Sequence, residues 1–115
     1  RYGPNYNVMG VAKAALECSV RYLAAEFGEI GVRVNAISAG PVKTLAFKGI
    51  AGSDILLNIN RVRSPMQRNV TLEEVGKCGL YFASDLSTAV TGETHHVDCG
   101  LHAVTIHKND SKLVE

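Results

Sequence analysis

A tyrosine and a lysine stand seven positions apart near the start of the chain, at Tyr6 and Lys13. On an α-helix a seven-residue step is close to two turns, so both side chains would share one face, about 10 Å apart along the axis. A phenol hydroxyl and an ammonium group converging from these positions could reach one bound cofactor. The alternative, which a chance spacing also produces, is a tyrosine packed at a helix start and a solvated lysine.

A second candidate group is the segment 38–44, with the sequence SAGPVKT, directly after a predicted strand. In open α/β sheets, ligands bind outside the carboxyl ends of the strands. Gly40 lets the backbone approach a ligand closely, and Pro41 stiffens the turn. The Thr44 hydroxyl can donate and accept a hydrogen bond. The alternative is a simple strand-to-helix turn with Thr44 as the N-cap.

Five elements are predicted to position these groups, in the order helix, strand, helix, helix, strand. They span residues 7–27 (helix), 32–38 (strand), 44–64 (a helical segment in two parts), 72–84 (helix) and 93–98 (strand). The helices follow from apolar residues at three-and-four spacing. Strands separated by long helical crossovers indicate an α/β fold with a parallel sheet.

Two strands cannot form a stable sheet of this kind alone, so we expect this chain to be part of a larger domain. Residues 1–107 would be the carboxy-terminal half of that domain, and 108–115 a polar tail.

Local signals set the expected ends of the helices. Gly28 stands where a helix commonly stops, and Ser53 or Asp54 would cap the second part of the 44–64 segment, which Pro65 ends. Residues 71–74, with the sequence TLEE, have the form of a capping box for the next helix.

Composition excludes several classes of function. Twelve basic and eleven acidic residues leave a net charge of +1, which gives no field for nucleic acid or a membrane surface. No apolar run approaches the roughly 20 residues that span a bilayer. The three cysteines form no C-x-x-C pair, which argues against a disulfide framework or structural zinc and favours a reducing cytoplasm. Adjacent His95 and His96 would point to opposite faces of a strand, so no metal site is expected among the four histidines.

Taken together, the motifs resemble one family. The segments 4–10 (PNYNVMG) and 31–41 (GVRVNAISAGP) are similar almost letter by letter to the enoyl-acyl-carrier-protein reductases of the short-chain dehydrogenase/reductase superfamily. A looser similarity continues through 84–98, so the resemblance covers about residues 4–101. Other superfamily members space the pair as Tyr-x3-Lys, whereas the Tyr-x6-Lys found here is typical of the enoyl reductases. The resemblance implies a Rossmann-like, doubly wound parallel sheet, of which this chain is the carboxy-terminal portion.

The resemblance also implies roles for particular residues. Tyr6 would hydrogen-bond the thioester carbonyl of a trans-2-enoyl substrate, and Lys13 would hold the nicotinamide ribose of NADH. The implied cofactor-binding residues are Lys13, Gly40, Pro41, Val42, Lys43, Thr44, Leu45 and Ala46. The implied substrate-binding residues are Tyr6, Met9, Ala46, Phe47 and Ile50, although plain core packing is an equal alternative for Ile50. The implied partners are an acyl carrier protein that bears the substrate, and further copies of the chain in a homotetramer.

Several points stay open. The family ends its last strand with Asp-Gly-Gly, whereas this chain has Asp98-Cys99-Gly100, and a cysteine there would crowd a tight turn. The family's Gly-rich phosphate loop and its second active-site tyrosine would fall before residue 1. The acidic or basic residue that discriminates NADH from NADPH would also lie in that preceding half, so the choice of cofactor stays open. Basic residues at 61, 63 and 68 would either dock the carrier protein or form a solvated face. Two other functions remain: another short-chain reductase acting on a carbonyl, or a non-catalytic fragment.

Overall fold

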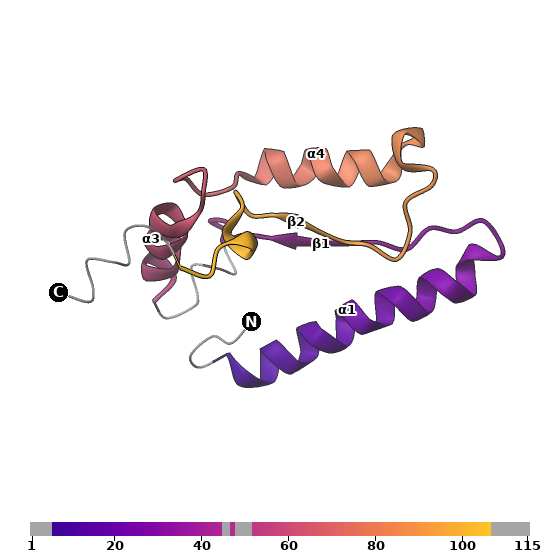
Figure 1. The fold of residues 1–115 in the computed structure, drawn as a ribbon, viewed down its shortest axis with the longest axis horizontal. Coiled ribbons are helices and arrows are strands. Elements are labelled where there is room, and N and C mark those ends of the chain that lie inside the picture. The colour runs from indigo at the N-terminus through magenta and orange to yellow at the C-terminus, as the bar shows by residue number, and fades with distance from the viewer. Residues whose placement is uncertain (1–5, 45–46, 48–51, 107–115) are drawn as a thin grey trace. The chain divides into compact units, whose positions relative to one another are not determined.

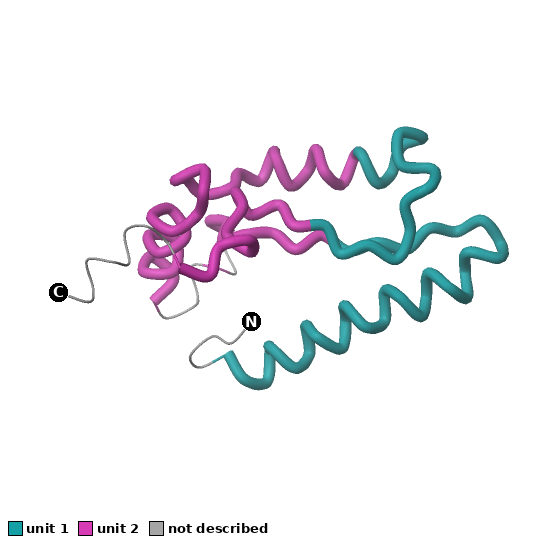
Figure 2. Tube along the Cα trace, viewed as in Figure 1, with its two compact units in different colours: residues 1–36, 81–95 teal, residues 37–80, 96–115 magenta. Residues whose placement is uncertain are grey.

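The computed structural model describes residues 6–44, 47 and 52–106 (Figure 1). The elements are α1 (Asn7–Gly28), β1 (Ala36–Ala39), α3 (Ser53–Arg63), α4 (Leu72–Ala83) and β2 (Thr94–Val97), with short 3-10 turns η1 (Asp85–Ser87) and η2 (Leu101–Ala103). Figure 2 shows two compact units, one of residues 1–36 and 81–95 and one of residues 37–80 and 96–115. Both strands and α4 contribute residues to each unit.

The two strands form a parallel pair, as predicted. The Ala36 N–H donates to the Glu93 carbonyl at 2.8 Å, and the Gly40 N–H donates to the Val97 carbonyl at 3.0 Å. From the first bond to the second, the donor moves four residues forward along the chain, and the acceptor also moves four residues forward. Both strands therefore run in the same direction, which makes the pair parallel. The connection between the strands contains α3 and α4, as expected for a helical crossover.

The first strand is shorter than the predicted 32–38, because side chains replace the ladder before Ala36. The Val34 N–H donates to the Thr91 hydroxyl at 3.0 Å. The Asn35 amide donates to the Val90 carbonyl at 2.9 Å and accepts from the Glu93 N–H at 3.1 Å. The Gly92 N–H also donates to the Val34 carbonyl at 2.7 Å. Because side chains make most of the bonds around residues 34–35, regular strand pairing begins only at Ala36, and the prediction for 32–35 was wrong. The second strand is also one residue shorter at each end than the predicted 93–98.

The first helix confirms the prediction to within one residue. Its buried contacts are Val20 and Ala24, one turn apart. Gly28 is the last residue of the helix, and the chain then turns at Gly31, with φ of 77°. The Val32 N–H then donates to the Phe27 carbonyl at 3.0 Å and closes the end of the helix.

Arg33 ties the segment before β1 to the end of α4. Its guanidinium donates to the Phe82 carbonyl at 2.6 Å, the Ser87 hydroxyl at 3.0 Å, and the Val90 and Ser84 carbonyls at 3.3 and 3.5 Å. Carbonyls at a helix C-terminus lack helical partners and carry partial negative charge. The planar Arg33 guanidinium carries a positive charge and several N–H donors, so it can bind several of these carbonyls at once. This role of Arg33 was not predicted from the sequence.

In the second unit, α3 begins differently from the prediction. Its N-cap is Gly52, with φ of 79°, whereas Ser53 and Asp54 lie inside the first turn. The capping prediction was therefore wrong, although an acidic Asp54 in the first turn still favours the helix dipole. The predicted end is confirmed, because Ser64 is extended (ψ 142°) before Pro65.

The capping box at the start of α4 is confirmed in both directions. The Glu74 N–H donates to the Thr71 hydroxyl at 3.2 Å, and the Thr71 N–H donates to the Glu74 carboxylate at 2.9 Å. The helix accordingly begins at Leu72 and ends within one residue of the predicted 84. Within the described residues, no helix combines the length and apolarity needed to cross a membrane.

Candidate functional site

Tyr6 stands at the N-cap of α1, with φ of −109° and ψ of 9°. Its carbonyl accepts from the Gly10 N–H at 2.7 Å, which starts the helix. A Cβ built on Gly10 would lie 3.7 Å from the ring atom Cδ1, so the ring lies over this glycine. The side chain is 45% exposed and makes no capping bond within the described helix. The phenol group is thus placed by the backbone and remains available to a ligand.

Lys13 lies on the same helix, is exposed, and follows Tyr6 by nearly two turns. Tyr6 itself is the N-cap and does not have helical backbone angles, so its side chain lies outside the regular helix that carries Lys13. Met9, three residues after Tyr6, is 50% exposed and offers an apolar side chain near that end of the helix.

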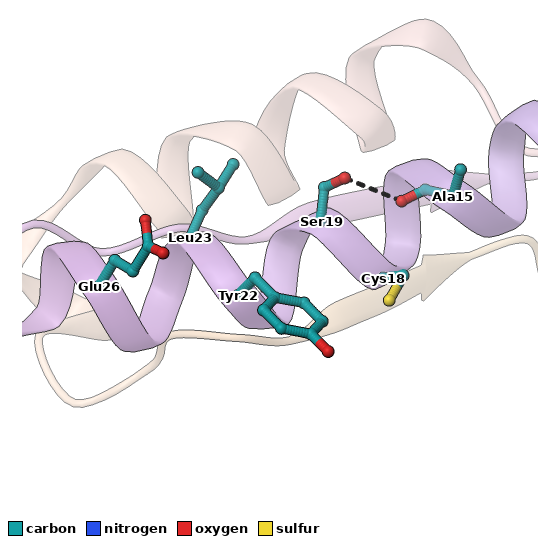
Figure 3. Close-up of a pocket in the computed structure, with 6 residues that line it drawn as sticks. All are labelled: Ala15, Cys18, Ser19, Tyr22, Leu23 and Glu26. Atoms are coloured by element: carbon teal, nitrogen blue, oxygen red, sulfur yellow. Dashed lines mark hydrogen bonds between the residues drawn. The ribbon is translucent and has the colours of Figure 1, made fainter.

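A groove of about 510 Å³ lies farther along α1. Figure 3 shows its six lining residues and the Ser19 hydroxyl donating to the Ala15 carbonyl at 2.9 Å. The lining residues recur at helical spacing on one stripe: Ala15, Cys18, Ser19, Tyr22, Leu23 and Glu26. The three-and-four spacing could have revealed this stripe in the sequence. It begins beyond Lys13, so it is a separate surface of the helix.

The loop 40–44 leaves the carboxyl end of β1, as predicted. Gly40, Pro41 and Val42 are half-buried, whereas Lys43 is exposed. From the sequence, Gly40 was expected to allow the close approach of a ligand. The structure gives another reason for glycine: a Cβ there would lie 3.1 Å from the Cα of Asp98 and 3.2 Å from its Cβ. The chain's own backbone already occupies that side.

Thr44 makes the capping bond that the structural alternative predicted. Its hydroxyl oxygen accepts from the Phe47 N–H at 3.1 Å, and its own N–H donates to the Val42 carbonyl at 2.9 Å. Accepting this bond uses one lone pair of the hydroxyl, which leaves its proton able to donate. Capping and ligand binding by Thr44 are therefore compatible.

Two hollows border this loop within the second unit. One of about 260 Å³ is lined by Lys43, Phe47, Ser53, Asp54 and Leu57. The other, of about 330 Å³, lies between residues 41–43, Leu57 and residues 69–72. The segment 69–72 was not predicted to take part in the site, because it adjoins the loop only in the fold.

Three of the predicted site residues, Leu45, Ala46 and Ile50, lie outside the described residues. Tyr6, Met9 and Lys13 belong to the first unit, whereas residues 40–44 and Phe47 belong to the second.

The three arginines considered for docking have different surroundings. Arg68 forms a two-pronged ion pair with Glu74, with N–O distances of 2.6 and 2.9 Å. The hydrogen bond from Arg68, followed by those from Thr71, holds the pKa of Glu74 at about 2. Arg61 donates to the Asn58 side chain at 2.9 Å, and both it and Arg63 lie in the last turn of α3. Arg68 is thus part of the fold, which weakens its predicted docking role.

The turn after β2 contains a buried carboxylate that the sequence analysis missed. Asp98 accepts from the Gly100 N–H at 2.9 Å, from the His102 N–H at 2.8 Å, and lies 2.9 Å from His102 Nδ1. Burial by itself raises the pKa of Asp98, but the hydrogen bonds from His102 and Gly100 outweigh it and lower that pKa. An aspartate four residues before a histidine, at the end of a strand, was the available signal in the sequence.

The histidines have separate contacts. His95 meets the Phe82 ring edge-on at 5.8 Å, and His96 stacks on His102 at 4.0 Å. Within residues 6–44, 47 and 52–106, no three His, Cys, Asp or Glu side chains gather as metal ligands. Cys18, Cys78 and Cys99 are free thiols, and burial raises the pKa of both Cys78 and Cys99.

Comparison with known proteins identifies relatives over almost the whole chain. A family model described as Enoyl-(Acyl carrier protein) reductase matches residues 1–102. The chain is 58% identical, over 108 residues, to Enoyl-[acyl-carrier-protein] reductase (NADH) 1 of Rhizobium meliloti (strain 1021), covering 94% of this chain and 40% of that protein. It is 56% identical, over 100 residues, to an Enoyl-[acyl-carrier-protein] reductase (NADPH) FabI of Staphylococcus aureus (strain MRSA252), covering 87% of this chain and 39% of that protein.

Solved structures give the same relationship. The enoyl-acyl carrier protein reductase of Bacillus cereus, with NADP+ and indole naphthyridinone, superposes with a TM-score of 0.88 at 51% identity, over 92% of this chain and 41% of that one. FabI from Candidatus Liberibacter asiaticus has a TM-score of 0.89 at 47% identity, over 94% of this chain and 42% of that one. The Rossmann-like fold class is confirmed. The chain spans about 40% of the length of the curated relatives it matches.

Proposed function

We propose, because the chain belongs to the enoyl-(acyl carrier protein) reductase family, that the protein reduces the trans-2 double bond of enoyl-acyl-carrier-protein thioesters with NADH. This reaction would be the last step of the elongation cycle in type II fatty-acid synthesis. The observation that supports the proposal most is that Tyr6, at the N-cap, and Lys13 lie at the same end of α1, with an exposed phenol that the helix does not use as a cap.

Tyr6 would stabilise charge that appears during the reaction. When bound, the nicotinamide would supply a hydride to the β-carbon of the substrate, and a proton from solvent would complete the reduction at the α-carbon. Between these two steps negative charge collects on the thioester oxygen, and the Tyr6 hydroxyl would donate a hydrogen bond to it. A donor aimed where charge develops lowers the barrier, because it binds the transition state more strongly than the substrate. The positive charge of Lys13 would favour the same anion through Coulomb attraction while its ammonium holds the ribose hydroxyls.

The loop after β1 would hold the cofactor, from Gly40 through Ala46. The fit rests on two observations: the loop leaves the carboxyl end of a parallel strand, and the Thr44 hydroxyl keeps a proton to donate to a phosphate oxygen. Met9, Ala46, Phe47 and Ile50 would border the acyl chain, for which apolar side chains are suited. The relatives include both NADH and NADPH enzymes, so both cofactors should be compared at equal concentration.

The test of the proposal is NADH oxidation with a trans-2-enoyl thioester, followed by absorbance on the full-length protein. We expect Tyr6→Phe to lower kcat by about 10²- to 10³-fold, the usual loss for one donor to a developing oxyanion. Tyr22→Phe is the matched control, since Tyr22 is an exposed tyrosine on the same helix outside the proposed site. It should retain full activity.

The other outcomes separate the alternatives. Turnover of a ketoacyl thioester but not of the enoyl thioester would replace the proposal with another short-chain reductase. Failure to bind either cofactor would favour the other alternative, a non-catalytic protein.

We also propose that Arg61 and Arg63, at the C-terminal end of α3, contact the acidic surface of the carrier protein. Charge reversal at Arg61 should then raise KM for carrier-bound substrate and leave that for a coenzyme A thioester unchanged. Equal losses on both substrates would contradict the docking role. Arg68 is unsuitable for this test because its replacement would also break the pair with Glu74.

The family resemblance further supports a homotetramer in the cytoplasm. Large apolar side chains on α1 are exposed, including Val8, Val11 and Tyr22, and association of copies is one way to cover them. Sedimentation of the full-length protein would test this, and a monomer at micromolar concentration would contradict it.

A further inference from the structure

The turn after β2 is organised by one buried carboxylate. Asp98 is 8% exposed, and its two oxygens face the Gly100 N–H, the His102 N–H and His102 Nδ1 at 2.8–2.9 Å. An ionised carboxylate only accepts hydrogen bonds, so Nδ1 must carry the proton and donate. A buried charge is tolerated only when it is bonded in this way. Asp98 and His102 therefore act together as a clasp that closes residues 98–102.

This clasp holds an unusual backbone. Cys99 and Gly100 have successive positive φ values of 57° and 85°. The Cys99 carbonyl accepts from the Met66 N–H at 3.3 Å, and a Cβ on Gly100 would lie 2.9 Å from Pro65 Cγ. The turn is thus pressed against residues 65–66 on one side, and its conformation depends on bonds that the clasp supplies.

On another side the turn touches the start of the loop 40–44. The Gly40 N–H donates to the Val97 carbonyl at 3.0 Å. The space for a Gly40 side chain is taken by the Cα and Cβ of Asp98, at 3.1 and 3.2 Å, and by Val70 Cγ1 at 3.4 Å. A movement of Asp98 would therefore displace Gly40, the first residue of the loop.

We propose that Asp98 and His102 are positioning residues for the cofactor, which brace the loop 40–44 in the conformation that receives it. The inference rests on the proposed function, because that function assigns the loop to cofactor binding. His102 does not touch the cofactor in this scheme. It fixes the Asp98 carboxylate, Asp98 supports Gly40, and the loop then loses less conformational freedom when the cofactor binds.

The experiment compares three variants of the full-length protein. His102→Ala removes the side-chain donor to Asp98. His102→Asn places an amide N–H close to the position of Nδ1 and should restore the bond. His96→Ala is the matched control, because it removes the ring stacked on His102 but has no bond to Asp98. The His102 side chain is 42% exposed, so its truncation leaves little empty volume.

Two readouts do not depend on turnover. Hydrogen exchange of the Gly40 amide, in cofactor-free protein, reports the attachment of the loop to β2. NADH affinity, from fluorescence titration without substrate, reports how well the loop 40–44 is arranged for cofactor binding. We expect His102→Ala to increase both the exchange rate and Kd by about tenfold, as for loss of one hydrogen bond to a charged group. His102→Asn and His96→Ala should stay within about twofold of wild type by the same reasoning.

A steady-state measurement separates positioning from general damage. In His102→Ala, KM for NADH should rise while kcat at saturating NADH is preserved. Unchanged exchange and affinity in His102→Ala would overturn the inference, as would equal losses in His96→Ala or no rescue by His102→Asn.

Failure of the proposed function is distinguishable from failure of this inference. Wild-type protein that binds NADH but does not reduce the enoyl thioester would refute the function, while the exchange and affinity measurements would still decide the role of the clasp.

Discussion

Cys99 has a backbone conformation that favours glycine, and this makes a quantitative test possible. Its φ is 57°, in the left-handed region, and its side chain is buried. A residue with a Cβ costs about 1–2 kcal/mol in that region, whereas glycine adopts it freely. The resemblance to the enoyl reductases places glycine at this position in the family, so the cysteine is the departure that carries the strain.

The informative comparison is between Cys99→Ala and Cys99→Gly, because both remove the buried sulfur. Alanine keeps the strain, whereas glycine relieves it. Glycine adds about 0.5–1 kcal/mol of unfolded-state entropy, which offsets part of the gain. The glycine variant should therefore be more stable than the alanine variant by about 0.5–1 kcal/mol, the difference between strain relief and entropy.

The assay is urea unfolding of the two full-length variants, followed by circular dichroism, with thermal melts as a second measure. For a protein of a few hundred residues, 1 kcal/mol corresponds to a shift in Tm of about 2–4 °C. Cys78 is the matched control: it lies inside α4, where alanine should be more stable than glycine by about 1 kcal/mol. An alanine variant at position 99 as stable as the glycine variant would refute the reasoning.

Two further predictions concern ion pairs and caps. Arg33→Lys should lower the free energy of unfolding by about 2 kcal/mol, because one ammonium cannot serve acceptors on Phe82, Ser87 and Val90 together; urea unfolding as stable as that of wild type would contradict this. The pKa of Glu74 is lowered from 4.5 to about 2, so its stabilising effect is complete above pH 4.5 and is lost as the pH falls towards 2. Over that interval wild type should lose more stability than Glu74→Gln in acid titrations, and parallel losses would show that the pair with Arg68 does not stabilise the fold.

The sequence by itself determined the elements whose signals are local. Apolar spacing over 7–27 set the first helix, and the hydroxyl and carboxylate of residues 71–74 set the start of α4. Proline at position 65 set the end of α3 at Arg63, two residues earlier. In each case the deciding interaction lies within about two turns of the chain, so neighbouring residues are sufficient to specify it.

Only the tertiary structure decided the features that join distant segments. Arg33 meets Ser87 across 54 positions, and Asn35 meets Val90 across 55, which moved the start of β1 to Ala36. The glycine at position 40 was assigned to ligand approach, but the backbone of Asp98 explains it. The sequence indicated that Cys99 would crowd a tight turn, but its left-handed conformation and the bonds of Asp98 with His102 are seen only in the folded structure. A short segment of sequence records its own periodicity and caps, but a close approach between segments is set by the packing of the whole domain.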